Sequence, residues 1–356
     1  MKDKNYIWQK AKIKNIELSN RIVRSATNEH LGTLDGCITD DYLKVYNDLA
    51  KSGIGLIITS HMAIDKNQRA DTTHICVNDS RNTDKLRLLT DIVHKYDSKI
   101  IAQISYPGHH GSKMEGQISK TPSGLGDTVA FSKKDIDQCI INHVTTIEFL
   151  QKVGFDGVQL HMAHGYLLSE FLDPYYNKRT DSYGGNINNR YRIIHEILMK
   201  LNKTIEDNFL ITAKIDTISK GEDKEFINQQ IQVCKWLERD GIDVIEMSGT
   251  NFKKFNQPTP YFLDNALKMR KEIDIPIILV GGFRNINQMN DALERGIDFI
   301  SMSRPFIADE NFIQKLKNGE ESICINCNQC FEIFKTKNKR CALRDDIIHQ
   351  LEINFP

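Results

Sequence analysis

Short apolar runs alternate with longer amphipathic segments along most of the chain. The amphipathic segments have the periodicity of helices with one buried face, and they span residues 39–53, 135–154, 188–203, 228–241 and 287–296. The apolar runs are rich in Val, Ile and Leu and have the length of buried strands, which predicts a parallel sheet covered by helices. Eight such runs occur, at residues 21–26, 55–60, 99–105, 156–161, 209–215, 243–248, 276–282 and 298–303.

Glycine ends several of the predicted helices just before the next strand, at Gly53, Gly154, Gly241 and Gly296. Glycine is favoured there because it adopts the left-handed backbone of a helix C-terminus without strain. The repeated order of strand, helix and glycine predicts a (β/α)8 TIM barrel over residues 1–318. A doubly wound open sheet is the alternative, and the lack of a G-x-G-x-x-G motif after the first strand disfavours it.

The composition is that of a globular protein with balanced charge. Hydrophobic residues make up 40% of the 356 positions, and 47 basic residues balance 47 acidic ones, so the sequence predicts no nucleic-acid partner. The N-terminal stretch lacks the apolar core of a signal peptide, and no apolar run approaches the roughly 20 residues that span a bilayer. We expect a cytoplasmic protein without a membrane partner, and a homo-oligomer is compatible with the sequence.

The ends of the predicted strands carry side chains suited to bind a ligand. In a TIM barrel the carboxyl ends of the strands form one face, and active sites lie there. These positions include neither a carboxylate pair of the glycosidase type nor a nucleophile elbow. The candidate ligand-binding residues at this face are Ser25, Ala26, Thr27, Asn28, Ser60, Gln103, Lys214, Gly281, Gly282, Ser303 and Arg304.

The last two predicted strands end in the segments VGGFRNINQ and SMSRPFIADE, which suit a phosphate group. Gly281 and Gly282 let backbone N–H groups approach an anion closely, and Arg304 supplies a permanent positive charge. The alternative is a tight turn beside a surface ion pair. Because both features lie at adjacent strand ends, we favour a ligand with a phosphate. Lys214, at the end of the fifth strand, is expected to face the barrel mouth and stabilise an anionic ring.

Two histidines and a tyrosine follow the fourth predicted strand in the segment HMAHGY, at His161, His164 and Tyr166. Imidazole N–H groups polarise a carbonyl by donating to its oxygen, and a phenol delivers a proton to a carbon that becomes basic on reduction. A metal site needs at least a third ligand, and the sequence suggests none nearby. We therefore expect these residues to bind and protonate a substrate, rather than to hold a metal or only to support the loop.

The segment HMAHGYLLSEFLDPYYNKRTDSYGGNINNRYR (161–192) resembles the signature of the Old Yellow Enzyme family of FMN-dependent ene-reductases, and of its dienoyl-CoA reductase and trimethylamine dehydrogenase branch. The segments NRIVRSATNE, AQIS, VGGFR and SMSRPFIADE occur in the family's order. The resemblance implies FMN at the barrel mouth, NAD(P)H as the reductant, and hydride transfer from FMN N5 to the β-carbon of an α,β-unsaturated carbonyl compound.

On the substrate side, the resemblance implies that His161 and His164 bind the activating carbonyl oxygen of the substrate. Tyr166 resembles the general acid that protonates the carbon next to that carbonyl. His109 and His110 stand where many members have Gly-Arg, so a substrate contact there is expected to differ.

On the cofactor side, two positions depart from the usual family pattern. Asn28 stands where well-studied members carry a Thr or Cys that tunes the flavin potential, and Lys214 stands where many have an arginine near flavin N1 and O2. The matching positions are Ser25, Ala26 and Thr27 against the flavin ring, Gln103 at its pyrimidine edge, and Gly281, Gly282, Ser303 and Arg304 around the phosphate.

Four of the eight cysteines lie in the segment CINCNQCFEIFKTKNKRC, at Cys324, Cys327, Cys330 and Cys341. Such a spacing suits a [4Fe–4S] cluster or a structural zinc ion, and we place the iron–sulfur cluster first, zinc second and unligated thiols third. The dienoyl-CoA reductase branch is similar, although its third spacing is usually one residue longer. We predict a cysteine-rich extension over residues 319–356 that packs on the barrel.

These features favour an NAD(P)H-dependent ene-reductase in which Tyr166 is the proton donor. The alternative is a dienoyl-CoA reductase-like or amine dehydrogenase-like flavoenzyme that uses its iron–sulfur cluster with an external electron carrier. A flavin barrel that modifies RNA is a third hypothesis, and the balanced charge disfavours it.

Overall fold

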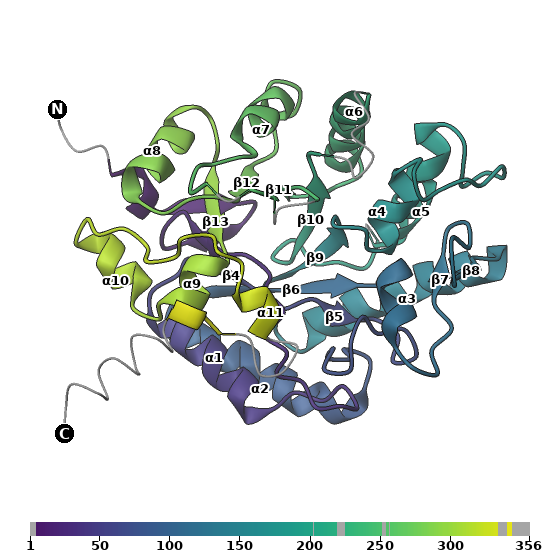
Figure 1. Cartoon of the computed structure of the whole chain (residues 1–356), viewed down its shortest axis with the longest axis horizontal. Coiled ribbons are helices and arrows are strands. Elements are labelled where there is room, and N and C mark those ends of the chain that lie inside the picture. The colour runs from purple at the N-terminus through teal and green to yellow at the C-terminus, as the bar shows by residue number, and fades with distance from the viewer. Residues whose placement is uncertain are drawn as a thin grey trace.

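The computed structural model describes residues 5–201, 203–218, 225–250, 254–255, 257–333 and 340–343. Its central sheet closes into a barrel of eight parallel strands, because β4 pairs with β6 as well as with β3 (Figure 1). The predicted TIM barrel is therefore confirmed, and the open sheet is excluded. The barrel strands are β3 (Ile22–Arg24), β4 (Leu56–Ile58), β6 (Lys99–Ser105), β9 (Gly157–Met162), β10 (Leu210–Asp216), β11 (Val244–Ser248), β12 (Ile277–Val280) and β13 (Phe299–Met302).

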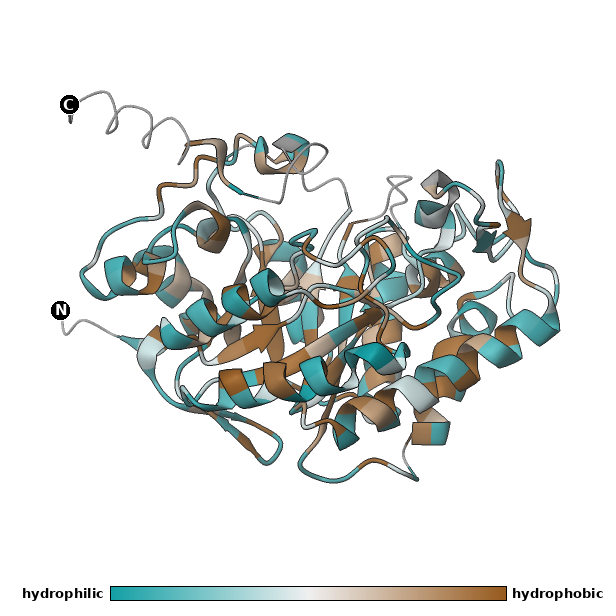
Figure 2. Cartoon of the chain, turned by 90° about the horizontal axis from the view of Figure 1, so that it is seen from below, coloured by the Kyte–Doolittle hydropathy of each residue, from teal (hydrophilic) through white to brown (hydrophobic). Residues whose placement is uncertain are grey.

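Helices surround the barrel and turn their apolar faces toward it, as the hydropathy colouring in Figure 2 shows. Several of them begin at side-chain caps: Thr39 accepts a hydrogen bond from the amide of Tyr42, Ser132 and Asp135 form a capping box, and Asn285 accepts from the amide of Gln288. The main helices are α1 (Asp40–Lys51), α2 (Thr83–His94), α3 (Lys133–Lys152), α5 (Ile187–Leu201), α6 (Phe226–Arg239), α7 (Leu263–Arg270) and α8 (Ile286–Glu294).

A hairpin that the sequence analysis did not predict closes the N-terminal end of the barrel. It consists of β1 (Ala11–Ile13) and β2 (Ile16–Leu18), which pair antiparallel across a turn at Lys14. Ile13, Ile16 and Leu18 join one apolar cluster with buried residues from the first half of most barrel strands. This end of the barrel is consequently filled with side chains, and the opposite end carries the polar residues.

The loops at the carboxyl ends of the strands carry short elements that build up the barrel mouth. They include β5 (Met62–Ala63), which pairs with the end of β6, and α4 (Leu167–Leu172), which follows β9. The other short elements are the 3₁₀ helices η1 (Tyr6–Trp8), η2 (Ser80–Asn82) and η3 (Gly108–Lys113), and the strands β7 (Lys120–Thr121) and β8 (Val129–Ala130).

The chain continues after the barrel through α9 (Arg304–Ala308), α10 (Phe312–Lys317) and α11 (Cys330–Ile333). Of the predicted extension over 319–356, residues 334–339 and 344–356 lie outside the described residues, and its boundary stays a prediction. The described part contacts the barrel, because the amide of Ser322 donates to the carbonyl of Arg284 in the loop after β12. None of the described helices has the length and apolar character needed to cross a membrane.

Candidate active site

A cavity of about 620 Å³ lies at the carboxyl ends of the barrel strands, which is within the usual range for ligand sites. Polar side chains from almost every barrel strand converge on it, together with Phe331 from the cysteine segment. The sequence-predicted residues that line this cavity are Ser25, Ala26, Thr27, Asn28, Gln103, His161, His164, Tyr166, Lys214, Gly281, Gly282, Ser303 and Arg304.

Ser60 is the predicted ligand-binding residue that does not line the cavity. Its hydroxyl lies 3.0 Å from the phenol oxygen of Tyr42, and its amide donates to Tyr46 at 2.6 Å. Both tyrosines are buried on α1, so the Ser60 side chain belongs to the contact between strand and helix. The next residue, His61, lines the cavity instead.

A buried ion pair forms part of the cavity floor. The ammonium of Lys214 lies 3.2 Å from the carboxylate of Glu246, and it donates to the hydroxyl of Ser25 at 2.9 Å. The Glu246 side chain has no exposed area, and it also accepts hydrogen bonds from Ser25 at 2.7 Å and Ser301 at 2.8 Å. The partners of this pair come from β10, β11 and β13, so the closed sheet fixes the positive charge in position.

Two amides continue the floor beside the ion pair. Gln103 donates to the side-chain oxygen of Gln159 at 2.7 Å, and Gln159 donates to Glu246 at 3.1 Å. Gln103 and Gln159 are paired in register on the adjacent strands β6 and β9. The orientation of the Gln103 side chain is set by the barrel and not by a loop, because its amide nitrogen bonds to Gln159 on the neighbouring strand.

His161, His164 and Tyr166 come together at one side of the cavity. The ring of His161 lies 4.2 Å from that of Tyr166 and 5.3 Å from that of His164, measured between centroids. Burial, and then the neighbouring His164, lower the pKa of His161 well below its usual value, so this imidazole is neutral. Its Nδ1 is buried and has no hydrogen-bond partner among the described residues. Burial raises the pKa of the Tyr166 phenol, which keeps its proton.

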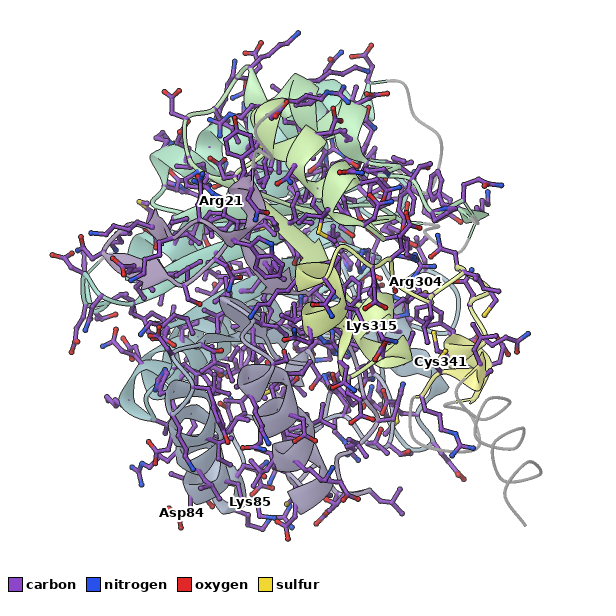
Figure 3. All side chains as sticks on the ribbon, turned by 90° about the vertical axis from the view of Figure 1, so that its left-hand side faces the viewer. Arg21, Asp84, Lys85, Arg304, Lys315 and Cys341 are labelled. Atoms are coloured by element: carbon purple, nitrogen blue, oxygen red, sulfur yellow. The ribbon has the colours of Figure 1, made fainter. Side chains whose placement is uncertain are left out.

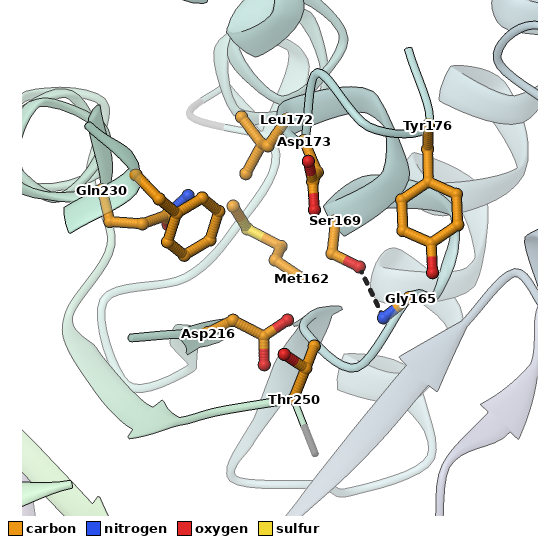
Figure 4. A pocket seen from close by; sticks show the side chains of 10 residues that line it. Met162, Gly165, Ser169, Leu172, Asp173, Tyr176, Asp216, Gln230 and Thr250 are labelled. Carbon is orange, nitrogen blue, oxygen red and sulfur yellow. Dashed lines mark hydrogen bonds between the residues drawn. The ribbon is translucent and has the colours of Figure 1, made fainter. Parts of the chain in front are cut away.

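Asp216 supports His164 from behind the cavity. His164 has a left-handed backbone with φ of 62°, and its amide donates to Asp216 Oδ2 at 2.7 Å, while its Nε2 lies 2.8 Å from the hydroxyl of Ser248. Figure 4 shows the carboxyl group of Asp216 at a second, small cavity of about 10 Å³, roughly the space of one water molecule. Burial raises the pKa of Asp216 to about 8.

Two further predicted departures have well-defined partners. The side-chain amide of Asn28 donates to Asp71 at 2.9 Å, and its oxygen accepts from the amide of His30 at 3.1 Å. His110 Nε2 donates to the carbonyl of His164 at 2.9 Å, and its ring lies 4.7 Å from Tyr166. Asn28 and His110 both line the cavity, so both shape the space beside the expected substrate position.

The predicted phosphate segments lie together at another part of the cavity wall. Both glycines have positive φ, and a Cβ at Gly282 would overlap the carbonyl oxygen of Thr259, so the packing of the loop itself requires glycine there. Arg304 is buried and donates to Tyr261 at 2.7 Å and to Asn328 at 2.8 Å. Two of its five N–H groups are used in these bonds, and Arg304 forms no ion pair of the kind considered as an alternative with any residue that the structure describes.

The four clustered cysteines line one small cavity of about 20 Å³ that also touches Arg304. Figure 3 shows Arg304 and Cys341 on the same side of the molecule. All four thiols are free of disulfides. Among the residues that the structure describes, no group of three or more His, Cys, Asp or Glu side chains is arranged to hold a metal ion. The thiol donors of the predicted cluster are thus gathered at one place, and the metal site stays a prediction.

Arg284 is a functional candidate that the sequence analysis missed. It lines the large cavity, and its guanidinium donates to the carbonyl of Cys324 at 2.6 Å and to the side chain of Asn326. Glu246 and Asp216 were also missed. A signal existed for the two acidic residues, because an acidic residue within or at the end of an apolar strand needs a partner or a function.

The fold and the cavity wall can be compared with known proteins. Residues 7–322 match the model of the NADH:flavin oxidoreductase / NADH oxidase family. The chain belongs to this family. Membership makes it an FMN-containing oxidoreductase that uses NAD(P)H, and it confirms the resemblance to Old Yellow Enzymes seen in the sequence.

The 4,4'-dithiodibutanoate disulfide reductase of Rhodococcus erythropolis is 25% identical to the chain, and the match covers 96% of each protein. A 2-naphthoyl-CoA reductase structure has a TM-score of 0.85 at 22% identity, with 94% of this chain and 56% of the other covered. The structure of the old yellow enzyme from Trypanosoma cruzi has a TM-score of 0.77 at 17% identity. The match covers 88% of this chain and 92% of the other. The chain also spans only about half the length, 55%, of two other curated relatives.

The residues around the cavity fit FMN. A flavin has a polar ring edge and a phosphate tail, and the cavity offers a floor of fixed donors from Lys214 and Gln103 and a separate wall with Arg284 and Arg304. Thr27 adds a link between these regions, because its hydroxyl lies 2.6 Å from that of Ser303. These side chains could hold a flavin ring on one side and its phosphate on the other, and the division of the cofactor site into these two sides stays a prediction.

Proposed function

We propose that the protein reduces the activated carbon–carbon double bond of an α,β-unsaturated carbonyl compound. FMN held in this cavity would supply, once reduced by NAD(P)H, the hydride that such a substrate accepts at its β-carbon. His161 and His164 hold the carbonyl oxygen, and Tyr166 gives the proton to the α-carbon.

One observation carries the proposal: His161, His164 and Tyr166 line the same cavity. The centroid of the His161 ring lies 4.2 Å from that of Tyr166 and 5.3 Å from that of His164. The imidazole of His161 is buried and neutral and has bonding capacity left for a ligand, because its Nδ1 lacks a partner among the described residues. A neutral imidazole with a free N–H is the donor that a carbonyl oxygen needs as it becomes negatively charged. The phenol beside it keeps its proton until a strongly basic carbon forms.

The test is Tyr166→Phe, studied under anaerobic conditions in two separate half-reactions. Reduction of the flavin by NAD(P)H should keep its wild-type rate, since no proton from Tyr166 is needed there. Reoxidation by 2-cyclohexenone should slow by about 10²- to 10⁴-fold, the usual contribution of a general acid. Stopped-flow absorbance of the flavin measures both rates.

Tyr176→Phe is the matched control, because Tyr176 stacks on His109 at 5.1 Å and lines the small cavity rather than the large one. This variant should reoxidise at the wild-type rate. A Tyr166→Phe enzyme that retains FMN and reoxidises as fast as wild type would show that Tyr166 is not the proton donor.

The second candidate is a reductase that receives or passes electrons through an iron–sulfur cluster and an external carrier. The gathering of Cys324, Cys327, Cys330 and Cys341 around one small cavity next to Arg304 favours it. Thiolate ligands are the donors that such clusters require, whereas unligated thiols rarely cluster so regularly.

Absorption and EPR spectra of protein purified without air separate the two candidates. Iron and sulfide in stoichiometric amounts, together with a reducible EPR signal that disappears in Cys327→Ser, would establish the cluster. Zinc without sulfide would indicate a structural metal site. Protein that contains neither iron nor zinc, even after anaerobic reconstitution, would rule out electron transfer through an iron–sulfur cluster and leave the ene-reductase as the remaining candidate.

A further inference from the structure

A line of side chains leads from the phenol of Tyr166 to a backbone amide in the loop after β5. The Tyr166 oxygen lies 3.3 Å from Nε2 of His61, and Nδ1 of His61 lies 3.2 Å from the hydroxyl oxygen of Ser105. The same hydroxyl lies 3.5 Å from Nε2 of His74, and the amide of Ala70 donates to Nδ1 of His74 at 3.0 Å. His61, Ser105 and His74 are all buried.

The backbone amide of Ala70 sets the direction of this line. An amide N–H only donates, so Nδ1 of His74 must present its lone pair. Burial lowers the pKa of His74 to about 4, and the imidazole is therefore neutral at neutral pH. A neutral imidazole with a lone pair on Nδ1 carries its single hydrogen on Nε2, 3.5 Å from the hydroxyl of Ser105, and the backbone of His61 also hydrogen-bonds this ring.

The same reasoning passes from Ser105 to His61. Because Nε2 of His74 carries its hydrogen, it has no lone pair for Ser105, and among the described residues Nδ1 of His61 is the acceptor within reach of the Ser105 hydroxyl. Burial, followed by the nearby His74, lowers the pKa of His61 well below its usual value. His61 is consequently neutral, with its hydrogen on Nε2 facing the oxygen of Tyr166.

The opposite direction is unfavourable. If Tyr166 donated to His61, the imidazole would carry its hydrogen on Nδ1 and donate to Ser105. The Ser105 oxygen would then accept from both histidines, and its own buried hydrogen would have no acceptor among the described residues. Buried hydroxyl groups are rarely left unsatisfied in this way.

We propose that His61 is a positioning residue that donates a hydrogen bond to the phenol oxygen of Tyr166 and leaves the phenolic hydrogen free to meet the substrate. The inference rests on the role of Tyr166 in the proposed function. The aromatic contact supports it, because the two rings meet edge to face with centroids 5.1 Å apart and His74 packs 4.3 Å from His61.

The protonation step then balances within the site. After hydride addition the α-carbon holds an electron pair, which forms a C–H bond while the O–H bond of Tyr166 breaks. The resulting phenolate faces the N–H of His61, and a hydrogen bond to a charged oxygen is stronger than one to a neutral phenol. Water returns the proton to Tyr166 before the next turnover.

Two substitutions of His61 separate this role from simple packing. In His61→Gln, the side-chain amide nitrogen falls near the position of Nε2 and keeps a donor for Tyr166. In His61→Asn, the shorter amide reaches only the position of Nδ1 and keeps the contact with Ser105. We expect reoxidation by 2-cyclohexenone to slow about 10- to 100-fold in His61→Asn, the loss expected for a hydrogen bond to a charged group. In His61→Gln, the reoxidation rate should stay within about threefold of wild type.

Flavin reduction by NAD(P)H needs no proton from Tyr166, so in His61→Asn it should slow by much less than reoxidation does, which distinguishes loss of the hydrogen bond from damage to the flavin site. In a Tyr166→Phe background, His61→Asn should cause no further slowing, because its effect acts through the phenol. Equal rates in wild type and His61→Asn would overturn the inference, as would equal slowing in Asn and Gln variants.

Nitrogen-15 NMR of histidine-labelled holoenzyme tests the hydrogen positions without any substitution, so it applies even if a variant fails to fold. The expected result is a hydrogen on Nε2 of both His61 and His74 at neutral pH, and a hydrogen on Nδ1 of His61 would overturn the inference. If Tyr166→Phe itself reoxidises normally, the proposed function fails. If Tyr166→Phe is slow and His61→Asn is not, only the inference about His61 fails.

Discussion

The two sides of the active-site cavity are built in different ways. On the side of His161 and Tyr166, the supporting contacts come from the barrel strands and the loops between them, and the ion pair of Lys214 and Glu246 lies on adjacent strands. On the predicted phosphate side, Arg304 donates to Tyr261 in the loop before α7, but Arg284 also hydrogen-bonds to Cys324 and Asn326, and Arg304 to Asn328, all in the segment that follows the barrel.

This difference separates chemistry from cofactor retention. A closed sheet is rigid and holds donors where charge develops, as catalysis requires. The cysteine segment is tied to Arg284 and Arg304 by hydrogen bonds and contributes no strand to the barrel. We therefore expect changes to the strand side to affect overall stability and reaction rates, and changes to the cysteine segment to affect FMN binding.

The largest effect is expected from Glu246→Leu on the strand side. Removal of this carboxylate leaves the ammonium of Lys214 buried without its opposite charge, and the free energy of unfolding should fall by about 3–5 kcal/mol. Chemical denaturation monitored by far-UV circular dichroism measures the change. Glu17→Leu, on the exposed hairpin, should leave the transition nearly unmoved. Similar midpoints for the two variants would show that the floor charges are not essential to the barrel.

A smaller effect is expected from Arg284→Leu on the phosphate side. The variant loses its bonds to Cys324 and Asn326 and a charge in the cavity wall, so FMN should bind about tenfold more weakly or worse. Fluorescence titration of the apoprotein with FMN measures the affinity, and both half-reactions at saturating FMN should stay near wild type. Arg295→Leu, at an exposed arginine directly after α8, is the control. Normal FMN affinity in Arg284→Leu would remove the distinction between the two sides.

A third effect is expected from Asp216→Asn, and it depends on pH. Burial raises the pKa of Asp216 from 3.8 to about 8, so between these values the folded state binds more protons than the unfolded state. Wild-type stability should therefore fall as the pH rises from about 4 to 8, and the asparagine should remove this loss. At pH 9 we expect Asp216→Asn to be more stable than wild type by at least about 1.4 kcal/mol, the value of a single pKa unit, and near pH 4 to equal wild type. Denaturant titrations at both pH values measure the difference, with Asp84→Asn at an exposed position as the control. A wild-type protein that becomes more stable as the pH rises from 4 to 8 would contradict the prediction.

Much of the site was predictable because strand ends can be found from the spacing of apolar runs, and in a closed parallel barrel they meet at one face. The prediction from sequence was wrong where a contact between distant parts of the chain decides which side chain faces the cavity. The β4 strand stops at Ile58, and Ser60 then turns toward tyrosines on α1 while His61 takes the position at the cavity. The local sequence ITSH does not show which of these two residues faces inward.

Glu246 and Arg284 were missed for a different physical reason. Their importance lies in partners on other strands or in the cysteine segment, and such pairs are visible only once the sheet has closed. Glu246 lies within an otherwise apolar strand, where a buried charge already demands compensation. The hydrogen direction along His74, Ser105 and His61 likewise depends on one backbone amide at Ala70, which no sequence pattern marks.

The hairpin β1–β2 has a consequence for how reactants reach the site. Because Ile13, Ile16 and Leu18 fill the far end of the barrel, molecules that react at its mouth must enter and leave on the same side. A reductant and an oxidant that share such an entrance have to take turns there. Steady-state kinetics should then show parallel lines in double-reciprocal plots, and each reactant in excess should inhibit by occupying the place of the other.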